Sequence, residues 1–384
     1  RVMQLFDLIN GLLNRDAETY KRHLSIERFP VIPISAHSGL IGFYPDCETL
    51  HSLIKSYREA HNIVINLEHR IMNHFTVDYE TCSVLQKTEA FEYAMDNSAG
   101  DDLQKAMWYR SYNAETWLDR RSNYTRSLAV MSMAGYVLGL GDRHPSNLLQ
   151  HLSGKIVHID FGDCFEVAKT REKYPETIPF RLTRMLTMAM EVGGIEGSFK
   201  MTAINTMRVL RDNRDSLMAV LEAFVYDPLV SWHYLQDNPS HPSTSSANPA
   251  ADIDNPLFLP YHIFGKEQQN LLLTNTNTKT NINTTSHPHP HPHSDSVSDS
   301  ASDSDSVSDP TGDKHKAKNT DKDKWQMANP RAIAIVQRIL SKLRGRDFDP
   351  KTVLSVHAQI DYLVADATSS ENLSQCYIGW CAFW

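Results

Sequence analysis

The chain has 384 residues, of which 41% are hydrophobic and 22% are charged, so it is long enough for one large domain or two ordinary domains with a sizeable core. Its formal net charge of −8 argues against a general nucleic-acid binder, which is normally basic, and no uncharged stretch approaches the roughly 18 apolar residues of a membrane span. Five scattered cysteines are too few for a disulfide framework, so we expect a reduced, intracellular setting.

The chain begins with a helix and then a β-hairpin. Apolar residues recur at helical spacing over residues 2–13, which predicts an amphipathic helix. Residues 28–35 and 38–44 are bulky, β-prone runs on either side of a small-residue turn, so they predict a hairpin. From about residue 46 to 150 the periodicity is helical.

A second hairpin and a long helix are predicted next. Residues 147–150 and 155–161 flank the turn signal Ser153-Gly154, which indicates the hairpin. Residues 201–225 then repeat apolar side chains at helical spacing, and Asp227-Pro228 ends this pattern. We therefore predict one amphipathic helix over 201–225.

Composition changes near residue 236. The segment 236–325 is dominated by polar residues, with a His-Pro repeat at 287–293 and a Ser-Asp run, and it cannot bury enough apolar surface to offset chain entropy. We predict that it is disordered. Alternating imidazoles can bind Zn²⁺ or Ni²⁺, but proline keeps the backbone extended and splays the His side chains apart, which favours plain low complexity.

Helical structure is expected to resume after this insert. Asn329 caps a helix that begins at Pro330, and Gly345 ends it. A last helix is predicted over 351–367, and an aromatic segment follows it.

The stretch "GLGDRHPSNLL" (139–149) carries a kinase-like spacing. Asp142 and Asn147 are five positions apart, as are the Asp and Asn of the protein-kinase catalytic loop, although His144 here follows the Asp. The second predicted hairpin ends in Asp160-Phe161-Gly162, the sequence of the metal-binding segment of kinases.

These residue types suit phosphoryl transfer, which needs metal ions on the phosphates and an oriented hydroxyl. Asn147 and Asp160 would converge on Mg²⁺ (or Mn²⁺) from opposite strands of the hairpin. Asp142 would accept the proton of the substrate hydroxyl, and His144 would stabilise charge on the transferring phosphoryl group.

Each feature alone also has a structural explanation. An Asp-Arg-His loop is more often a turn held by hydrogen bonds, and a single Asp-Phe-Gly is common. His158 is expected to be a structural strand residue and His151 an exposed turn residue. Only the combination, in this order, favours a kinase.

Three stretches, at 123–147, 159–186 and 372–384, resemble the phosphoinositide 3-kinase-related protein kinases, and within them the target of rapamycin (TOR) branch. The resemblance implies an α+β, two-lobed protein/lipid-kinase-like domain with C-terminal FATC helices. The implied parts are the remainder of the N-lobe and hinge at 1–44, the C-lobe at 45–235, the insert at 236–325, a C-terminal kinase helix at 326–350 and FATC at 351–384.

The resemblance also implies roles for individual residues. Asp142 and His144 would be catalytic, and Asn147 and Asp160 would bind metal. The residues implied in ATP binding are Ile41, Gly42, Phe43, Tyr44, Leu149 and Ile159. Those of the activation segment are Phe161, Gly162, Lys169, Arg171, Pro179 and Phe180, and those of the aromatic FATC tip are Tyr377, Trp380, Phe383 and Trp384.

The resemblance implies an ATP-dependent Ser/Thr protein kinase of nutrient and growth signalling, with two alternatives. A phosphoinositide lipid kinase would carry clustered basic residues after Asp-Phe-Gly, whereas Lys169, Arg171 and Lys173 alternate here with neutral or acidic residues. A pseudokinase scaffold is disfavoured because the four catalytic and metal-binding residues are all present.

Because the chain begins at Arg1, without the glycine-rich strands and the phosphate-binding Lys of the family, we expect an inactive fragment of a longer kinase.

Partners follow from the resemblance as well. Helices at about 60–115 resemble an insertion that docks a WD40-propeller subunit, although such helices are first of all core elements, and by the same analogy large scaffold subunits are expected as partners.

The aromatic tip has two possible environments. It either packs against the large lobe, which we favour, or contacts a membrane surface. Cys376 and Cys381 could form a disulfide, but free thiols are expected in a reducing cytosol. We expect a cytoplasmic location, with peripheral endomembrane (lysosome or vacuole) and nuclear locations left open.

Overall fold

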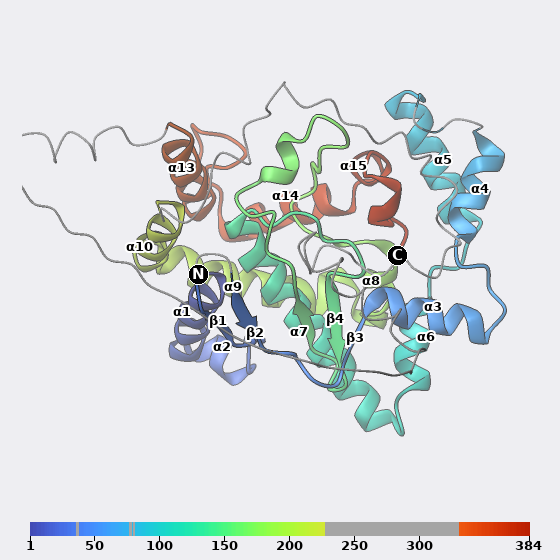
Figure 1. The fold of residues 1–384 in the computed structure, drawn as a ribbon, viewed down its shortest axis with the longest axis horizontal. Coiled ribbons are helices and arrows are strands. Elements are labelled where there is room, and N and C mark those ends of the chain that lie inside the picture. Colours follow the sequence, from blue (N-terminus) through green and yellow to red (C-terminus); the bar gives the residue numbers. More distant parts are fainter. Residues whose placement is uncertain (36–37, 77–78, 80, 227–329) are drawn as a thin grey trace, which may run out of the picture. The chain divides into compact units, whose positions relative to one another are not determined.

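The computed structural model describes residues 1–35, 38–76, 79, 81–226 and 330–384 (Figure 1). In this part the chain is mostly helical, with one sheet of two strands and one of three, which agrees with the predicted α+β class. The stretches before and after the undescribed 227–329 contact each other within one unit. The predicted disordered insert and the predicted cap Asn329 lie outside the described residues. Among the described helices, none has both the length and the apolar character needed to cross a bilayer.

The first helix and the first hairpin lie where the pattern predicted them. Helix α1 (Val2–Arg15) buries one apolar face, and Asp16 then caps the short helix α2 (Ala17–Lys21) by accepting a hydrogen bond from the Thr19 N–H at 3.0 Å. Strands β1 (Val31–Pro33) and β2 (Gly39–Ile41) pair antiparallel. Both predictions are confirmed.

The second sheet has three antiparallel strands. Strands β4 (Leu148–His151) and β5 (Ile156–His158) form the second predicted hairpin. Strand β3 (Cys47–Thr49) adds to β4, in the order β3-β4-β5. The prediction of helix from residue 46 onward was wrong here, because this strand of three half-polar residues is held by a partner a hundred positions away and leaves no local pattern.

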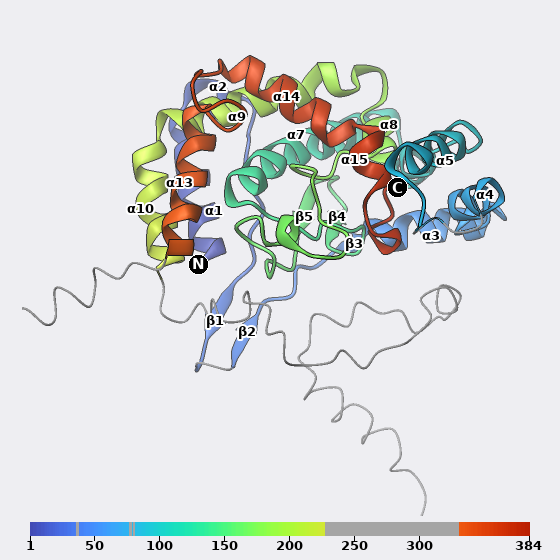
Figure 2. The same cartoon turned by 90° about the horizontal axis from the view of Figure 1, so that it is seen from above.

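Helix α7 (Ala114–Leu138) is the core element behind this sheet, as Figure 2 shows. Its second half is buried on nearly every side, which hides any amphipathic period. The buried Ser127 hydroxyl accepts a hydrogen bond from the Ile156 N–H at 2.9 Å and so joins α7 to strand β5. The helices that precede it are α3 (Leu50–Ala60), α4 (Leu67–Phe75), α5 (Val84–Asp96) and α6 (Asp102–Tyr109).

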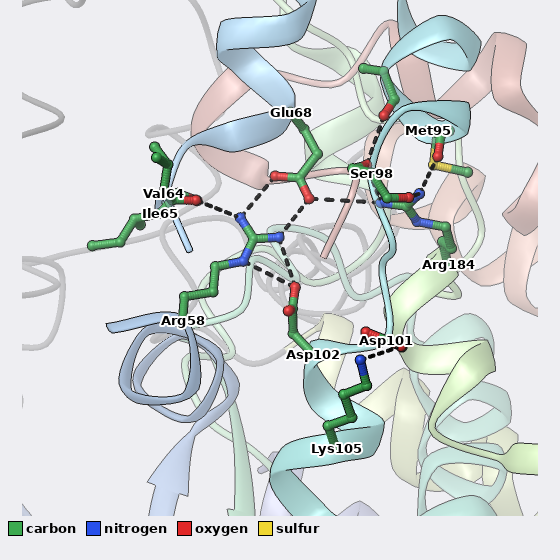
Figure 3. Close-up of polar contacts among 11 residues, drawn as sticks. Arg58, Val64, Ile65, Glu68, Met95, Ser98, Asp101, Asp102, Lys105 and Arg184 are labelled. Carbon is green, nitrogen blue, oxygen red and sulfur yellow. Dashed lines mark hydrogen bonds and ion pairs between the residues drawn. The ribbon is translucent and has the colours of Figure 1, made fainter. Parts of the chain in front are cut away.

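A buried arginine joins these preceding helices (Figure 3). The Arg58 guanidinium, on α3, donates to both Glu68 oxygens of α4 at 2.9 and 2.5 Å. It also donates to Asp102 of α6 at 3.0 and 2.8 Å and to the Ile65 carbonyl at 2.6 Å. The two carboxylates offset the cost of burying the cation. The position of α4 relative to α3 and α6 therefore depends on this cluster.

The segment after the sheet contains several short helices and two longer ones. The prediction of one helix over 201–225 was wrong, because α9 (Lys200–Asp212) and α10 (Arg214–Val225) are separate helices with a break at Asn213. The Asn213 side-chain amide donates to the Val209 carbonyl at 2.9 Å and so closes the end of α9. The shorter elements are a 3₁₀ turn at Val167–Thr170, α8 (Arg184–Met188), a 3₁₀ turn at Glu191–Gly193 and a π-helical turn at Ile195–Phe199.

The C-terminal part packs back onto the lobe. Helix α13 is described over Pro330–Arg344 and is followed by Gly345 with φ 66°, which agrees with the predicted end, and it lies against α10 in both views (Figures 1 and 2). The last predicted helix begins later than expected, since α14 is Val356–Thr368 and Ser355 caps it by accepting from the Ala358 N–H at 3.1 Å. Helix α15 (Ser370–Ser374) and a 3₁₀ turn at Ile378–Trp380 complete the chain.

Helix α13 is held to the lobe by a charge cluster around Glu166. The Lys342 ammonium is buried and lies 2.8 Å from the Glu166 carboxylate, and Arg338 and Lys169 lie 3.1 and 3.3 Å from it. Burial raises the pKa of Glu166, but the charges of Lys342 and Lys169 outweigh it and lower that pKa to about 2. Burial lowers the pKa of Lys342 to about 8 against the opposing charge of Glu166.

We expect Glu166→Gln to lower the free energy of unfolding of this chain by about 3 kcal/mol at pH 7, because it leaves Lys342 buried without a counter-charge. The folded-state pKa of Glu166 lies below its ordinary value of 4.5, so its contribution is present above pH 4.5 and is lost as the pH falls towards 2. Urea unfolding of wild type and variant should therefore converge over that range.

Glu196→Gln is the matched control, since Glu196 is 76% exposed and pairs with Lys200 at 2.8 Å. It should change the free energy of unfolding by less than about 1 kcal/mol. A difference between wild type and Glu166→Gln that stays constant from pH 7 to pH 3 would contradict the assignment.

Candidate active site

The predicted catalytic loop lies between the end of α7 and the start of β4. Gly139 ends the helix with φ 67°, and a Cβ atom there would stand 2.6 Å from the Glu166 nitrogen, so only glycine fits. The Gly141 N–H then donates to the Asp163 carbonyl at 2.8 Å. These two contacts bring the loop against the segment that follows β5.

The backbone of Asp142 is held on both sides. Its φ of 56° is left-handed, which is uncommon for a residue other than glycine. The Asp142 N–H donates to both oxygens of Glu176, at 2.9 and 3.1 Å, and the Asp142 carbonyl accepts from the side-chain amide of Asn147 at 2.9 Å. The side chain of Asp142 takes part in none of these bonds.

Asn147 and Asp160, the predicted metal ligands, are brought together at one end of the β4–β5 hairpin. The Asn147 carbonyl accepts from the Ile159 N–H at 3.1 Å, so the two strands remain paired up to this point. The Asn147 amide nitrogen bonds Asp142, which orients its side-chain oxygen as an acceptor. Asp160 has φ 57°, and its Oδ1 accepts from the Gly162 N–H at 3.2 Å.

This donor set fits a hard divalent cation that is also held by phosphate oxygens. One carboxylate and one amide oxygen are ligands that Mg²⁺ takes together with substrate phosphates. Within the described residues, no three His, Cys, Asp or Glu side chains form a cluster that could hold a metal ion. The pair therefore fits a metal ion whose remaining ligands are phosphate oxygens.

Arg143, which follows Asp142 in the loop, has a structural role. Its buried guanidinium donates to the carbonyls of Gly141 and Ile159, each at 2.7 Å, and to that of Asp160. The planar fork therefore ties the catalytic loop to the end of β5.

The neutral ring of His144 can donate a hydrogen bond from Nε2. Its Nδ1 accepts from the Ser146 N–H at 3.2 Å, so the proton of the neutral ring is on Nε2. Burial lowers the pKa of His144, against the charge of Asp142, and keeps the ring neutral near pH 7. His158, by contrast, is a fully packed strand residue, as predicted.

The predicted activation-segment residues are mostly anchored. The Phe161 ring meets those of Phe6 and Phe29 at centroid distances of 5.5 and 6.4 Å, and Phe180 is buried. Lys169 pairs with Glu166, and Arg171 pairs with Asp163 and lies 3.5 Å from Glu176. Lys169 and Arg171 thus have acidic partners within the lobe. Gly162 and Pro179 lie in the same segment, outside helices and strands.

The predicted ATP-binding residues near the hinge present apolar side chains that are largely exposed to solvent. Ile41 is 68% and Phe43 is 89% exposed, and Gly42 closes the hairpin by donating from its N–H to the Pro30 carbonyl at 2.8 Å. The Tyr44 hydroxyl donates to Glu27 at 2.5 Å. Leu149, on β4, and Ile159, just after β5, are half-buried. These residues alone do not enclose an adenine ring.

Two charged residues of the site were missed in the sequence, Glu176 and Arg181. Both lie within "PETIPFRL" (175–182), among apolar neighbours, and both are buried. A charged residue inside an apolar run is a signal of internal pairing, since an isolated buried charge is costly. The partners themselves could not be read from that signal.

Arg181 joins the catalytic loop to the aromatic end of the chain. Its guanidinium donates to the Arg143 carbonyl at 3.1 Å, to the Trp380 carbonyl at 2.7 Å and to the Cys381 and Trp384 carbonyls at 2.6 Å each. It also lies 4.1 Å from the centroid of the Trp380 ring. Burial lowers the pKa of Arg181 to about 10, so it is charged at neutral pH.

The aromatic tip packs inward. Trp380, Phe383 and Trp384 are buried, and the Phe383 ring stacks on Phe91 of α5 at 4.6 Å, whereas Tyr377 is 49% exposed. The packing alternative favoured from the sequence agrees with these contacts. Cys376 and Cys381 form no disulfide, and burial raises the pKa of their thiols to about 12 and about 11.

Comparisons with protein families match most of the chain. Residues 1–234 match the family model described as phosphatidylinositol 3- and 4-kinase, and residues 353–384 match the FATC domain.

Curated relatives match the whole chain. It is 48% identical to the serine/threonine-protein kinase mTor of Drosophila melanogaster and 47% identical to the serine/threonine-protein kinase tor1 of Schizosaccharomyces pombe, with 100% of this chain covered in both cases. It is 44% identical to the serine/threonine-protein kinase TOR of Arabidopsis thaliana. The chain spans only 14 to 15% of the length of these relatives.

Solved structures show the same fold. The chain matches the FAT and kinase domain of CtTel1 with a TM-score of 0.64 and 24% identity, over 100% of this chain and 20% of that one. The complete CtTel1 dimer matches with the same TM-score over 11% of its chain.

We expect Arg181→Lys to expose the aromatic end, because an ammonium group cannot reach four carbonyls at once. Opening of residues 376–384 should become easier by about 3 kcal/mol, which hydrogen exchange of this segment would measure. Arg28→Lys is the control, because Arg28 makes an exposed ion pair with Asp7 at 2.8 Å. Equal exchange in both variants would show that the Arg181 contacts are dispensable.

Proposed function

We propose that this chain, which belongs to the phosphatidylinositol 3- and 4-kinase family, is the catalytic part of a TOR-type protein kinase that transfers the terminal phosphoryl group of ATP to serine or threonine hydroxyls. The observation that carries the proposal is the hydrogen-bonded arrangement at the end of the β4–β5 hairpin: Asn147 bonds the Asp142 carbonyl and pairs with Ile159, and Arg143 donates to the carbonyl of the adjacent Asp160. The identity of 44 to 48% to kinases named as TOR supports the same conclusion.

Each residue of the site has a separate role in the proposed phosphoryl transfer. Asn147 and Asp160 would hold Mg²⁺ (or Mn²⁺) with the nucleotide, and the metal, when bound, neutralises phosphate charge. The carboxylate of Asp142 accepts the proton of the attacking hydroxyl. The Nε2–H of His144 donates to the phosphoryl oxygens, where negative charge develops. Ile41, Phe43, Leu149 and Ile159 would contact the adenine.

The acceptor is proposed to be a protein because the activation segment offers little free positive charge. Lys169 is paired with Glu166, and Arg171 with Asp163 and Glu176. A phosphoinositide head group carries several phosphates and needs basic side chains without acidic partners. The lipid-kinase alternative therefore has less support in this segment.

Further contacts of the whole protein are proposed from its surface. The helices α4 and α5 carry exposed apolar side chains on the segment expected to dock a WD40-propeller subunit, namely Phe75, Val84, Leu85 and Tyr93. Membrane contact through the aromatic tip would begin at Tyr377, because the other tip aromatics are packed. Large scaffold subunits and a cytoplasmic location with peripheral endomembrane contact complete the proposal.

In the full-length protein we expect Asp142→Asn to lower kcat by at least about a thousandfold, because the hydroxyl loses its proton acceptor. ATP affinity should change little. Asp119→Asn on the exposed side of α7 is the matched control and should retain wild-type activity. Full activity of Asp142→Asn would overturn the assignment.

The same full-length protein is used to test whether the phosphoryl acceptor is a protein or a lipid. Radiolabelled ATP is offered with a Ser/Thr peptide and, separately, with phosphoinositide vesicles. We expect label in the peptide alone, and it should disappear when EDTA removes divalent metal. Label in the lipid alone would make the lipid-kinase alternative the correct one.

A further inference from the structure

Glu176 is a buried acid of the activation segment that has no role in the proposed chemistry. It is 7% exposed, yet both of its carboxylate oxygens face the Asp142 N–H, at 2.9 and 3.1 Å. Burying a carboxylate is costly unless strong donors meet it, and a backbone N–H bonded to an ionised acceptor is one of the stronger hydrogen bonds in proteins.

The segment that carries Glu176 is itself fixed. The Glu176 N–H donates to the Ala168 carbonyl at 3.0 Å, and the Arg171 guanidinium lies 3.5 Å from its Oε1. Arg171 also pairs with Asp163, whose carbonyl accepts from the Gly141 N–H. Glu176 is thus the member of this network that reaches the residue predicted to receive the substrate proton.

The conformation of Asp142 explains what the contact achieves. A left-handed residue other than glycine is strained and persists only where its surroundings hold it. The carbonyl side is held by Asn147, which is also a predicted metal ligand, and the N–H side is held by Glu176. Without the carboxylate, the peptide between Gly141 and Asp142 can rotate towards an ordinary conformation and carry the side chain of Asp142 away.

We propose that Glu176 is a positioning residue, which holds the peptide of Asp142 so that the Asp142 carboxylate faces the acceptor hydroxyl. This inference rests on the proposed function of Asp142. It makes the order of the activation segment a condition for the order of the catalytic loop, because one side chain belongs to both. Glu176 itself touches neither nucleotide nor acceptor.

The test uses the full-length protein with Glu176→Ala, Glu176→Gln and the control Glu172→Gln, an exposed acid of the same segment. We expect Glu176→Ala to lower kcat by about a hundredfold, as for a small displacement of a reacting group, and to change the KM for ATP by less than about threefold. Glu176→Gln retains an acceptor oxygen and should restore about a tenth of wild-type kcat. Glu172→Gln should match the wild type.

A second measurement separates positioning from a general loss of structure. Hydrogen exchange of residues 139–147 should accelerate in Glu176→Ala while exchange within α7 and α9 stays at the wild-type rate. The inference is overturned if kcat of Glu176→Ala matches that of Glu172→Gln. It is also overturned if exchange accelerates throughout the lobe while kcat per folded molecule is unchanged.

Failure of the proposed function is recognised separately. It is judged on wild type and Asp142→Asn, whereas the Glu176 variants are compared with wild type on whichever acceptor, peptide or lipid, the wild-type protein uses. Faster exchange confined to 139–147 together with a lowered kcat on a lipid acceptor would support the positioning role and refute the protein acceptor.

Discussion

The buried guanidinium of Arg181 holds the catalytic loop and the aromatic end of the chain together. It carries a full charge into the interior, where its two terminal nitrogens donate to four backbone carbonyls, one from the catalytic loop and three from residues 380–384. A cation without these acceptors could not stay buried, and carbonyls without the cation would lack donors. The catalytic loop and the end of the chain are therefore stable only together.

Arginine is used in the same way at two other junctions of the fold. Arg143 collects carbonyls from both sides of the β4–β5 hairpin, and Arg58 collects carboxylates from α4 and α6 (Figure 3). The planar, five-donor fork suits such junctions better than lysine, because several acceptors at fixed angles are met at once. The ring of Trp384 lies 5.3 Å from the Arg58 guanidinium, so two of the junctions share one aromatic residue.

The FATC segment is in this structure an internal part of the lobe. Its tryptophans pack against Arg181 and Arg58, and Phe383 stacks on α5. The surface helices α4 and α5 are thereby linked to the catalytic loop through buried contacts. A partner bound to those helices would act on a region that shares its packing with the site.

Much of the candidate site could be predicted because its signals are local. The spacing of Asp142 and Asn147, the turn before β5 and the Asp-Phe-Gly segment all lie within about twenty residues, where backbone geometry limits the arrangements that a hairpin allows. The contribution of Glu176 could not be predicted. Its hydrogen bond spans 34 positions, and its apolar neighbours in "PETIPFRL" indicate internal pairing without identifying Asp142 as the partner.

The two hairpins, most of the helices and the order of the chemical groups along the chain could be predicted from the residues alone, since these follow from periodicity, turn residues and spacing. Three features are seen only in the folded chain: β3 joins the sheet, residues 200–225 form two helices, and the aromatic end is buried against Arg181. These outcomes depend on hydrogen bonds and burial between distant segments, and such contacts leave no periodic signal in either partner.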